Sequence, residues 1–263
     1  MAIITYQTDK IEAYLNKIYP DYALSVQTTK LGGRTDCFEE AGHFETLSKK
    51  IKVKDITGID VPIWVSTGSN SNKKTVAIVA QDPLRNKNDK MLTGVDFKQP
   101  IIGTPFALHY KQDKYPQTEV YRRIIAGLLN EFDVYITDAH KIYSRDITFG
   151  RDKKREIDTL KNEFTARKPA FVITFGTTAK EYVKFPNLKT LNLLHPSQTN
   201  WDHWKQWIFE QALEGNKKYG VDWATYAKQI GCRKDMFGSY KPDVNMHEVI
   251  ANIVLDMVKH LNP

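Results

Sequence analysis

The sequence predicts an α/β fold with three layers, in which helices cover both faces of a central, mainly parallel, four-stranded sheet. Two observations support this prediction. Four short apolar runs rich in β-branched residues occur between residues 75 and 197, and amphipathic segments of helical length separate most of them. Strands that alternate with helices form parallel crossovers, and these crossovers bury the sheet between two helical layers.

The first apolar run, TVAIVA at 75–80, is short and has the composition of a buried strand. Asp82, followed by Pro83, comes two residues after it. Before it, VPIWVSTG at 61–68 is typical of a strand. The polar loop at 66–74 between these two segments predicts a hairpin. The first 60 residues contain one helix candidate, DKIEAYLNKIY at 9–19, within irregular polar sequence.

After the first strand the pattern becomes regular. A helix expected at 115–132 places Val120, Ile124, Leu128 and Phe132 on one face. The remaining elements follow in order: a strand at 133–140, a helix at 154–169, a strand at 170–176, a helix that begins at 177 and a strand at 189–197.

Length and composition fit one domain over residues 1–263, with a core at about 75–210 and decorations at 1–60 and 211–263. Hydrophobic residues make up 41%, enough for a sizeable core, and no apolar run approaches the roughly 20 residues that span a bilayer. The start of the chain lacks the pattern of a signal peptide, and the two cysteines fit no metal spacing. We therefore expect a cytoplasmic monomer without a membrane partner.

The chain is basic, with 38 Lys and Arg against 31 Asp and Glu, a formal charge of +7. This balance favours a polyanionic partner such as DNA, although many basic proteins bind none. The positive residues are spread along the chain, at Arg122–Arg123, 150–156 and 166–169. Each cluster by itself is more typical of a solvated helix face than of a binding patch.

Polar residues and a glycine follow the ends of the four predicted strands. They are Asp82, Asp138, Gly176 and His195. In an open parallel sheet, ligands bind beyond the carboxyl ends of the strands. A capping acid or a solvated histidine would explain any one of these residues, but two acids, a glycine and a histidine at one rim together predict a functional site.

The segments around these strand ends also carry a family pattern. In order they read IVAQDPLRN at 78–86, GTPFALHY at 103–110, VYITDAHK at 134–141, KPAFVITFGTTAKEYV at 168–183 and LLHPSQTNW at 193–201. Together they resemble the uracil-DNA glycosylase superfamily over about 75–201. The resemblance implies the α/β/α fold of that superfamily, DNA as partner and a base flipped out of the strand.

The resemblance also implies roles for individual residues. Asp82 matches the carboxylate that stabilises the sugar cation and orients the attacking water, and His195 matches the histidine that faces the pyrimidine O2. Ser197 corresponds to a phosphate-gripping hydroxyl. Phe106 would stack on the flipped base, although a plain core phenylalanine is an equal alternative. Gln81 is expected beside the base.

Two positions depart from the family pattern. Where the family has tyrosine and histidine after Asp-Pro, this chain has Leu84 and Arg85, so the pocket around pyrimidine C5 is different in shape and carries a cation. Drift within the loop is the alternative explanation. The second departure is Asp138, where the family commonly has the asparagine that reads uracil.

An aspartate at position 138 favours cytosine. Cytosine offers an amino donor at C4 and an acceptor at N3, the reverse of uracil. One oxygen of Asp138 would accept from the amino group, and the other would share a proton with N3. A carboxyl group buried against a base holds such a proton because loss of solvation disfavours its charged form.

The predicted function is a monofunctional glycosylase that excises a C5-modified cytosine, such as the hydroxymethylated or glucosylated cytosine of phage DNA, in antiviral defence. Uracil removal in DNA repair, a catalytically silent DNA-binding protein and a nucleotide hydrolase are the alternatives. No cofactor or metal is expected. The DNA would be single- or double-stranded. Gln198, Thr199 or Trp201 would insert into the duplex as a wedge in place of the flipped base, and Lys141 would also contact the DNA. Lys141 is close enough in sequence to the site for a Schiff base to stay open as an alternative.

Overall fold

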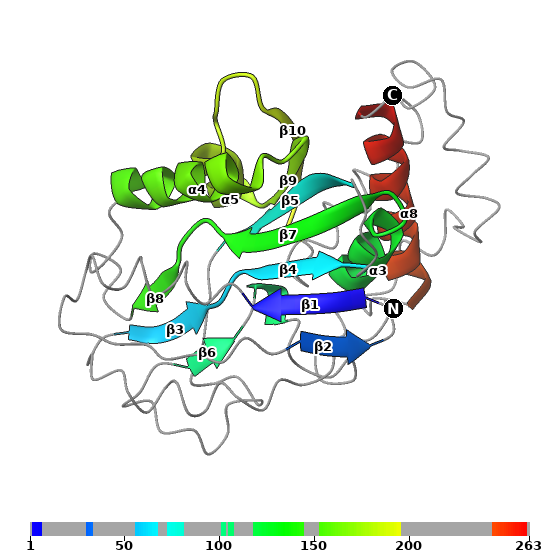
Figure 1. Ribbon diagram of the computed structural model, residues 1–263, viewed down its shortest axis with the longest axis horizontal. Helices are drawn as coiled ribbons and strands as arrows, with labels where there is room; N and C mark the ends of the chain where they lie inside the picture. The colour runs from blue at the N-terminus through cyan, green and yellow to red at the C-terminus, as the bar shows by residue number, and fades with distance from the viewer. Residues whose placement is uncertain are drawn as a thin grey trace, which may run out of the picture.

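The computed structural model describes residues 2–6, 30–33, 56–67, 73–81, 101–103, 105–107, 118–144, 153–195 and 244–261. Within them the chain forms a seven-stranded sheet of order β10-β9-β5-β7-β4-β1-β2 and a three-stranded sheet of order β6-β3-β8. Helices pack against the larger sheet (Figure 1). The α/β fold class expected from the sequence is therefore confirmed.

The four predicted parallel strands are all present and adjacent. They are β5 (Lys74–Ala80), β7 (Phe132–Asp138), β9 (Phe171–Phe175) and β10 (Lys189–Leu193). Strand β5 lies between β7 and β9 and is parallel to both. Their short β-branched runs are buried because helices cover the two faces, which is the usual reason for continuous apolar strands in parallel sheets.

The sheet is larger than predicted, because three antiparallel strands extend it beyond β7. These are β4 (Ile63–Ser66), β1 (Ala2–Tyr6) and β2 (Lys30–Gly33). The predicted hairpin between β4 and β5 is wrong, since β4 pairs with β7 and β1 instead. Two strands from the first 60 residues thus belong to the main sheet. The assignment of a single domain over 1–263 stays a prediction.

The smaller sheet lies next to the carboxyl end of β7. It consists of β3 (Ile56–Asp60), which pairs in parallel with β6 (Ile101–Gly103) and antiparallel with β8 (Ile142–Ser144). Three residues connect β7 to β8, and two residues connect β3 to β4. Because both connections are short, the smaller sheet lies directly beside the end of the larger one at which β7 ends (Figure 1).

Two pairs of helices cover the main sheet. Helices α4 (Lys153–Arg167) and α5 (Thr177–Tyr182) pack on one face, where Leu160, Phe164 and Ala179 share a core cluster with residues of β5, β7 and β9. Helices α3 (Thr118–Leu128) and α8 (Val244–Leu261) pack together, and α3 also contacts β7 (Figure 1). No helix of the described residues is long and apolar enough to cross a membrane.

Alternation along β7 assigns its side chains to the two faces, because successive residues of a strand point to opposite sides. Tyr135 belongs to the core cluster beneath α4 and α5. Thr137 shares its face, whereas Val134, Ile136 and Asp138 point to the opposite one. Asp138 is therefore directed away from α4, towards the side on which α3 lies.

The contact between α3 and α8 is close. A Cβ atom added to Gly127 would lie 2.3 Å from Leu255 Cδ1. Glycine at this position therefore lets the two helices approach each other. Helix α3 ends at Leu128, four residues earlier than predicted, and Phe132 is the first residue of β7 instead of part of the helical face.

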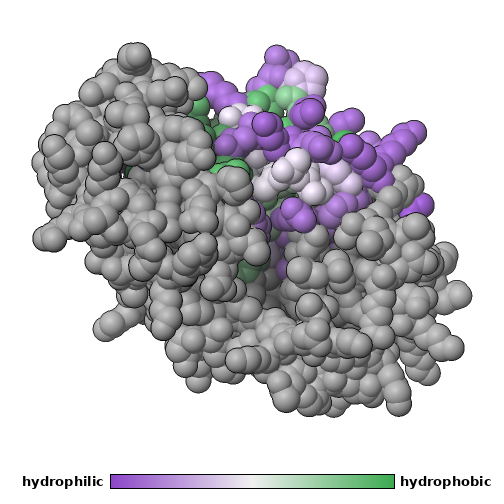
Figure 2. Space-filling view, turned by 180° about the vertical axis from the view of Figure 1, so that it is seen from behind, coloured by the Kyte–Doolittle hydropathy of each residue, from purple (hydrophilic) through white to green (hydrophobic). Residues whose placement is uncertain are grey.

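The prediction of solvated helix faces is borne out by Lys153, Lys154 and Lys168, which are exposed, but not by Arg122. Arg122 of α3 is only 1% exposed, and Glu156, within the basic cluster at 150–156, is fully buried. Exposed charges do cover the outer side of α4, for example Lys153 and Lys161. The surface over α4 and α5 is accordingly mostly hydrophilic (Figure 2).

Candidate functional site

The carboxyl ends of the parallel strands converge at one rim. Ala80 and Asp138 are partners in the ladder between β5 and β7, and the pairing continues beyond both strands. There the backbone N–H of Ala139 donates to the carbonyl of Ala80 at 2.9 Å, and that of His140 to the carbonyl of Gln81 at 3.0 Å. The backbone just before the predicted catalytic loop is thus fixed to the backbone just after Asp138.

Gly176 joins the other two strand ends to this rim. A Cβ atom at this residue would lie 3.3 Å from the Gln81 side-chain oxygen and 3.6 Å from His195 Cβ. Its φ of 90° also favours glycine, because side chains rarely tolerate that conformation. The structure therefore brings together Gln81, Gly176 and His195, as the sequence predicts for residues at neighbouring strand ends.

Three aromatic rings pack together beside these strand ends. Phe106, in the 3-10 turn η2 (Pro105–Ala107), stacks on Tyr121 of α3 with ring centroids 3.6 Å apart and planes at 25°. The ring of Phe175, the last residue of β9, is roughly perpendicular to both, with its centroid 5.6 Å from that of Phe106 and 5.0 Å from that of Tyr121. Stacked and edge-to-face pairs of this kind hold the rings in fixed orientations.

Phe106 has an unusual backbone. Its φ of 58° and ψ of 16° lie in the left-handed region, which a bulky side chain rarely occupies. Such strain persists only where the surrounding contacts impose it, and it is concentrated at functional sites. The stack on Tyr121 and the edge contact with Phe175 are the contacts that hold Phe106 in this conformation.

Tyr121 connects the two polar residues of the site. Its hydroxyl lies 3.4 Å from His195 Nε2, within hydrogen-bonding range. Burial and, secondarily, the negative charge of Asp138 raise the pKa of Tyr121 well above its usual value. Asp138 is 2% exposed, so its carboxylate acts on the hydroxyl through the low-dielectric interior. Asp138, Tyr121 and His195 therefore share one site.

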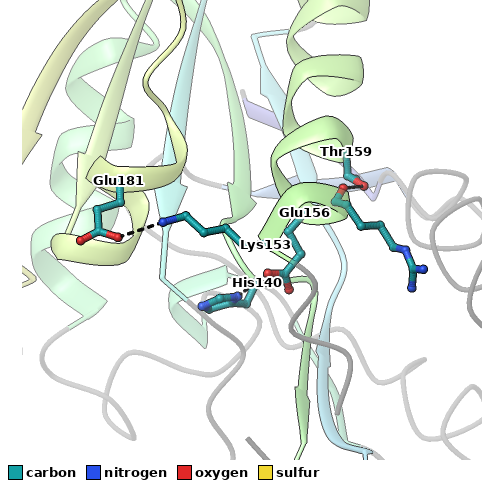
Figure 3. Close-up of polar contacts among 6 residues, drawn as sticks. His140, Lys153, Glu156, Thr159 and Glu181 are labelled. Atoms are coloured by element: carbon teal, nitrogen blue, oxygen red, sulfur yellow. Dashed lines mark hydrogen bonds and ion pairs between the residues drawn. The ribbon is translucent and has the colours of Figure 1, made fainter. Parts of the chain in front are cut away.

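The segment after Asp138 is held from the opposite face by two acids of α4. His140 Nδ1 lies 2.7 Å from Glu156 Oε2, and Lys141 Nζ lies 2.9 Å from Glu163 Oε1 (His140 and Glu156 in Figure 3). All four side chains are buried. The two glutamates are seven residues apart, two helical turns, and so project from the same side of α4.

The burial of Lys141 argues against the predicted DNA contact, which stays a prediction. The side chain is 1% exposed, and besides Glu163 its ammonium group donates to the Thr137 hydroxyl. A lysine that binds DNA phosphates must reach the surface, which this one does not. The same burial and pairing argue against a Schiff-base role. By contrast, the ion pair between Lys153 and Glu181, drawn in Figure 3, lies in solvent.

Several predicted residues lie outside the described part of the chain, and their roles stay predictions. These are Asp82, Leu84, Arg85, Ser197, Gln198, Thr199 and Trp201. The described residues on each side of them end at Gln81 and His195, which the structure places at the same rim. Within the described residues, no group of three or more His, Cys, Asp or Glu side chains could hold a metal ion.

The sequence pattern does not single out Tyr121 as a site residue. The helical periodicity marks the apolar face of α3 by Val120, Ile124 and Leu128, and a tyrosine beside them is typical of ordinary core. Its position in the helix that follows the Phe106 segment was the available signal. Aromatic stacking beside a buried acid and a histidine suits a planar heterocycle that has both faces and polar edges.

Comparison with known families agrees with this geometry. The family model described as the uracil DNA glycosylase superfamily matches residues 68–215, more than half of the chain. The match includes β5, β7, β9 and β10 and every residue of the site described above. No curated protein matched the chain. On the family match, this chain belongs to the uracil-DNA glycosylase superfamily.

Proposed function

We propose that this protein is a monofunctional DNA glycosylase that flips out a C5-modified cytosine and hydrolyses its N-glycosidic bond. Membership of the superfamily supports DNA glycosylase activity and DNA binding. The observation that carries the choice of base is the placement of Asp138. Its buried carboxylate acts on the Tyr121 hydroxyl, which in turn lies within hydrogen-bonding range of His195.

The chemistry requires charge stabilisation on both sides of the breaking bond. Positive charge develops on the sugar and negative charge on the departing base. Asp82 would stabilise the sugar cation and direct water to it, and His195 would donate a hydrogen bond to the base carbonyl. Water is then the nucleophile, and an abasic site is left. The enclosure of Lys141 by Glu163 and Thr137 agrees with a mechanism without a Schiff base.

Base selection follows from the acid at the end of β7. Asp138 would accept from the cytosine amino group through one oxygen and share a proton with N3 through the other. That proton also makes cytosine a better leaving group. Leu84 and Arg85 would form the C5 side of the pocket, where a cation and nearby polar groups suit a hydroxylated or sugar-bearing substituent.

The biological setting that fits this target is defence. Ordinary cytosine is a dangerous target for any cell, so strict preference for a modified base is expected. Hydroxymethylated or glucosylated cytosine of phage DNA meets that requirement. We propose that the protein acts in the cytoplasm as a monomer on such DNA, with uracil excision in DNA repair as the competing role that the family name favours.

The test is base release from oligonucleotides that carry uracil, cytosine, hydroxymethylcytosine or glucosylated hydroxymethylcytosine, each single- and double-stranded. We expect release of a modified cytosine by the parent protein, and none by Asp82→Ala. Release of uracil alone would keep the glycosylase and reject the proposed base. DNA binding without any release would support the silent DNA-binding alternative.

The role of Asp138 is tested by Asp138→Asn in the same assay. An asparagine donates to O4 and accepts from N3–H, so we expect preference to move from cytosine-type bases towards uracil, by roughly tenfold or more. Asp133→Asn is the matched control, because it makes the same change at the opposite end of β7. Unchanged preference in Asp138→Asn would exclude Asp138 as the base-reading residue.

A further inference from the structure

We propose that Tyr121 is a positioning residue that links Asp138 to His195 and favours the imidazole tautomer with its proton on Nε2. The proposal rests on the proposed function in one respect, namely that His195 donates to a base carbonyl. It adds a residue from α3 to a site otherwise built from strand ends and the Phe106 turn, and it assigns that residue a defined effect on the histidine.

The surroundings of Tyr121 hold its ring in place. The side chain is 2% exposed, one face stacks on Phe106 with ring centroids 3.6 Å apart, and the centroid of the roughly perpendicular Phe175 ring is 5.0 Å away. The His195 ring lies 6.2 Å from the Tyr121 ring at 62°, with Nε2 near the hydroxyl. Because the ring is fixed, the remaining freedom of the group is rotation of its O–H bond.

The neighbouring charge selects the direction of that bond. Burial and Asp138 raise the pKa of Tyr121, so the hydroxyl keeps its proton at physiological pH. The negative carboxylate attracts the positive end of the O–H dipole. With its hydrogen drawn towards Asp138, the phenol oxygen presents a lone pair to His195 Nε2, 3.4 Å away. A hydrogen bond then forms when His195 Nε2 carries the hydrogen and donates it to the Tyr121 oxygen.

The favoured tautomer is the one that the proposed chemistry needs. A base carbonyl can only accept, so His195 can stabilise the departing base only through N–H. If Nε2–H already donates to Tyr121 in the free protein, an incoming base takes over that hydrogen bond without any transfer of a proton. The donor is therefore oriented before the substrate arrives, which is the condition for effective electrostatic stabilisation.

The alternative is that Tyr121 only fills the core. Tyr135 provides a matched control for that alternative, because it is also a buried tyrosine whose pKa is raised by burial and by a nearby acid, Glu163. It belongs to the core beneath α4 and α5, on the other face of the sheet. Tyr121→Phe and Tyr135→Phe each remove one buried hydroxyl and keep the ring.

The experiment is nitrogen NMR of the histidine rings in the free protein, which reports the tautomer directly. The chain has seven histidines, so the signals of His195 can be assigned by their loss in His195→Gln. We expect Nε2–H to dominate in the parent protein and in Tyr135→Phe, and its share to fall in Tyr121→Phe. A parent His195 protonated on Nδ1 would overturn the proposal, as would an unchanged tautomer in Tyr121→Phe.

A kinetic measurement accompanies the spectrum. We expect single-turnover base release to fall roughly tenfold in Tyr121→Phe, less than the loss typical of a group that itself takes part in the chemistry, with unchanged DNA affinity. Tyr135→Phe should release base at the parent rate. If no variant, including the parent, releases a base, the proposed function fails while the NMR result still decides the role of Tyr121.

Discussion

The two buried tyrosines of this protein have opposite surroundings. Tyr135 lies beneath α4, close to Glu163 and Arg167, and the guanidinium of Arg167 lies 5.5 Å from its ring centroid. Tyr121 lies on the α3 side, stacked on Phe106 and close to Asp138 and His195. Both hydroxyls are buried beside an acid, yet only Tyr121 is at the rim where the strand ends converge.

One set of surroundings is a network of buried polar pairs, and the other lies at the rim of the proposed site. Beneath α4, Glu163 faces the ammonium group of Lys141, and Glu156 faces the imidazole ring of His140. Buried ion pairs contribute little net stability but are costly to break. At the rim, Tyr121 stacks on Phe106, lies within hydrogen-bonding range of His195 and feels the negative charge of Asp138. These contacts are the basis of the proposed site.

The largest effect is expected from breaking the network beneath α4. Glu163→Ala leaves the Lys141 ammonium buried without its acid, which typically costs about 3–5 kcal/mol of unfolding free energy. Urea denaturation measures the loss. The double variant Lys141→Met, Glu163→Leu removes both charges and should recover most of it. A loss below about 1 kcal/mol in Glu163→Ala would show that the ion pair between Lys141 and Glu163 contributes little to stability.

A smaller effect is expected where α8 packs on α3. Gly127→Val introduces a side chain into space that Leu255 occupies, and overpacking of this kind costs about 1–3 kcal/mol. Leu255→Ala should relieve part of that cost in the double variant, and thermal unfolding of the four proteins gives the coupling between the two positions. Strict additivity would mean that the helices separate instead of clashing.

The two tyrosine variants sharpen the comparison itself. Tyr135→Phe removes a buried hydroxyl that makes no hydrogen bond, so we expect stability to change by less than about 1 kcal/mol and base release to continue at the parent rate. Tyr121→Phe removes a hydroxyl that lies within hydrogen-bonding range of His195, so we expect slower base release. Equal effects of both variants on both quantities would abolish the distinction between the two sides of the sheet.

The smallest effect concerns alkaline pH. Raised pKa values mean that folded Tyr121 and Tyr135 keep their protons where the unfolded chain loses them, near the ordinary value of 10.0. Their contribution is complete below that pH and is lost as the pH rises above it. Unfolding free energy measured at increasing pH should decline above about 10, less steeply in either Tyr→Phe variant. Tyrosinate absorbance that develops without unfolding would contradict burial.

The core strands were predictable because their residues have a single consistent pattern. The runs that became β5, β7, β9 and β10 are short, β-branched and separated by amphipathic helices, so both type and parallel arrangement followed. The antiparallel extension was not predictable. Strands β1 and β2 are separated by more than twenty residues, and β4 carries no mark that it pairs with β7 rather than β5.

Part of the site was predictable for the same reason. Residues at the ends of parallel strands meet at one rim, so Asp82, Asp138, Gly176 and His195 could be assigned to it from sequence, and all but Asp82 lie among the described residues. The roles of Tyr121 and Lys141 could not be predicted in this way, because they depend on the direction in which each side chain points. A tyrosine on an apolar helix face is typical core, and a lysine near the site suggests a DNA contact, until Glu156 and Glu163 are found facing inwards from α4.

The packing of α8 on α3 has a consequence for protein synthesis. More than a hundred residues separate the two helices, so α3 leaves the ribosome long before its partner exists. Until residues 244–261 emerge, the apolar surface of α3 that they cover is open to chaperones and to other nascent chains. The risk of aggregation during synthesis is therefore greatest in the interval before α8 docks.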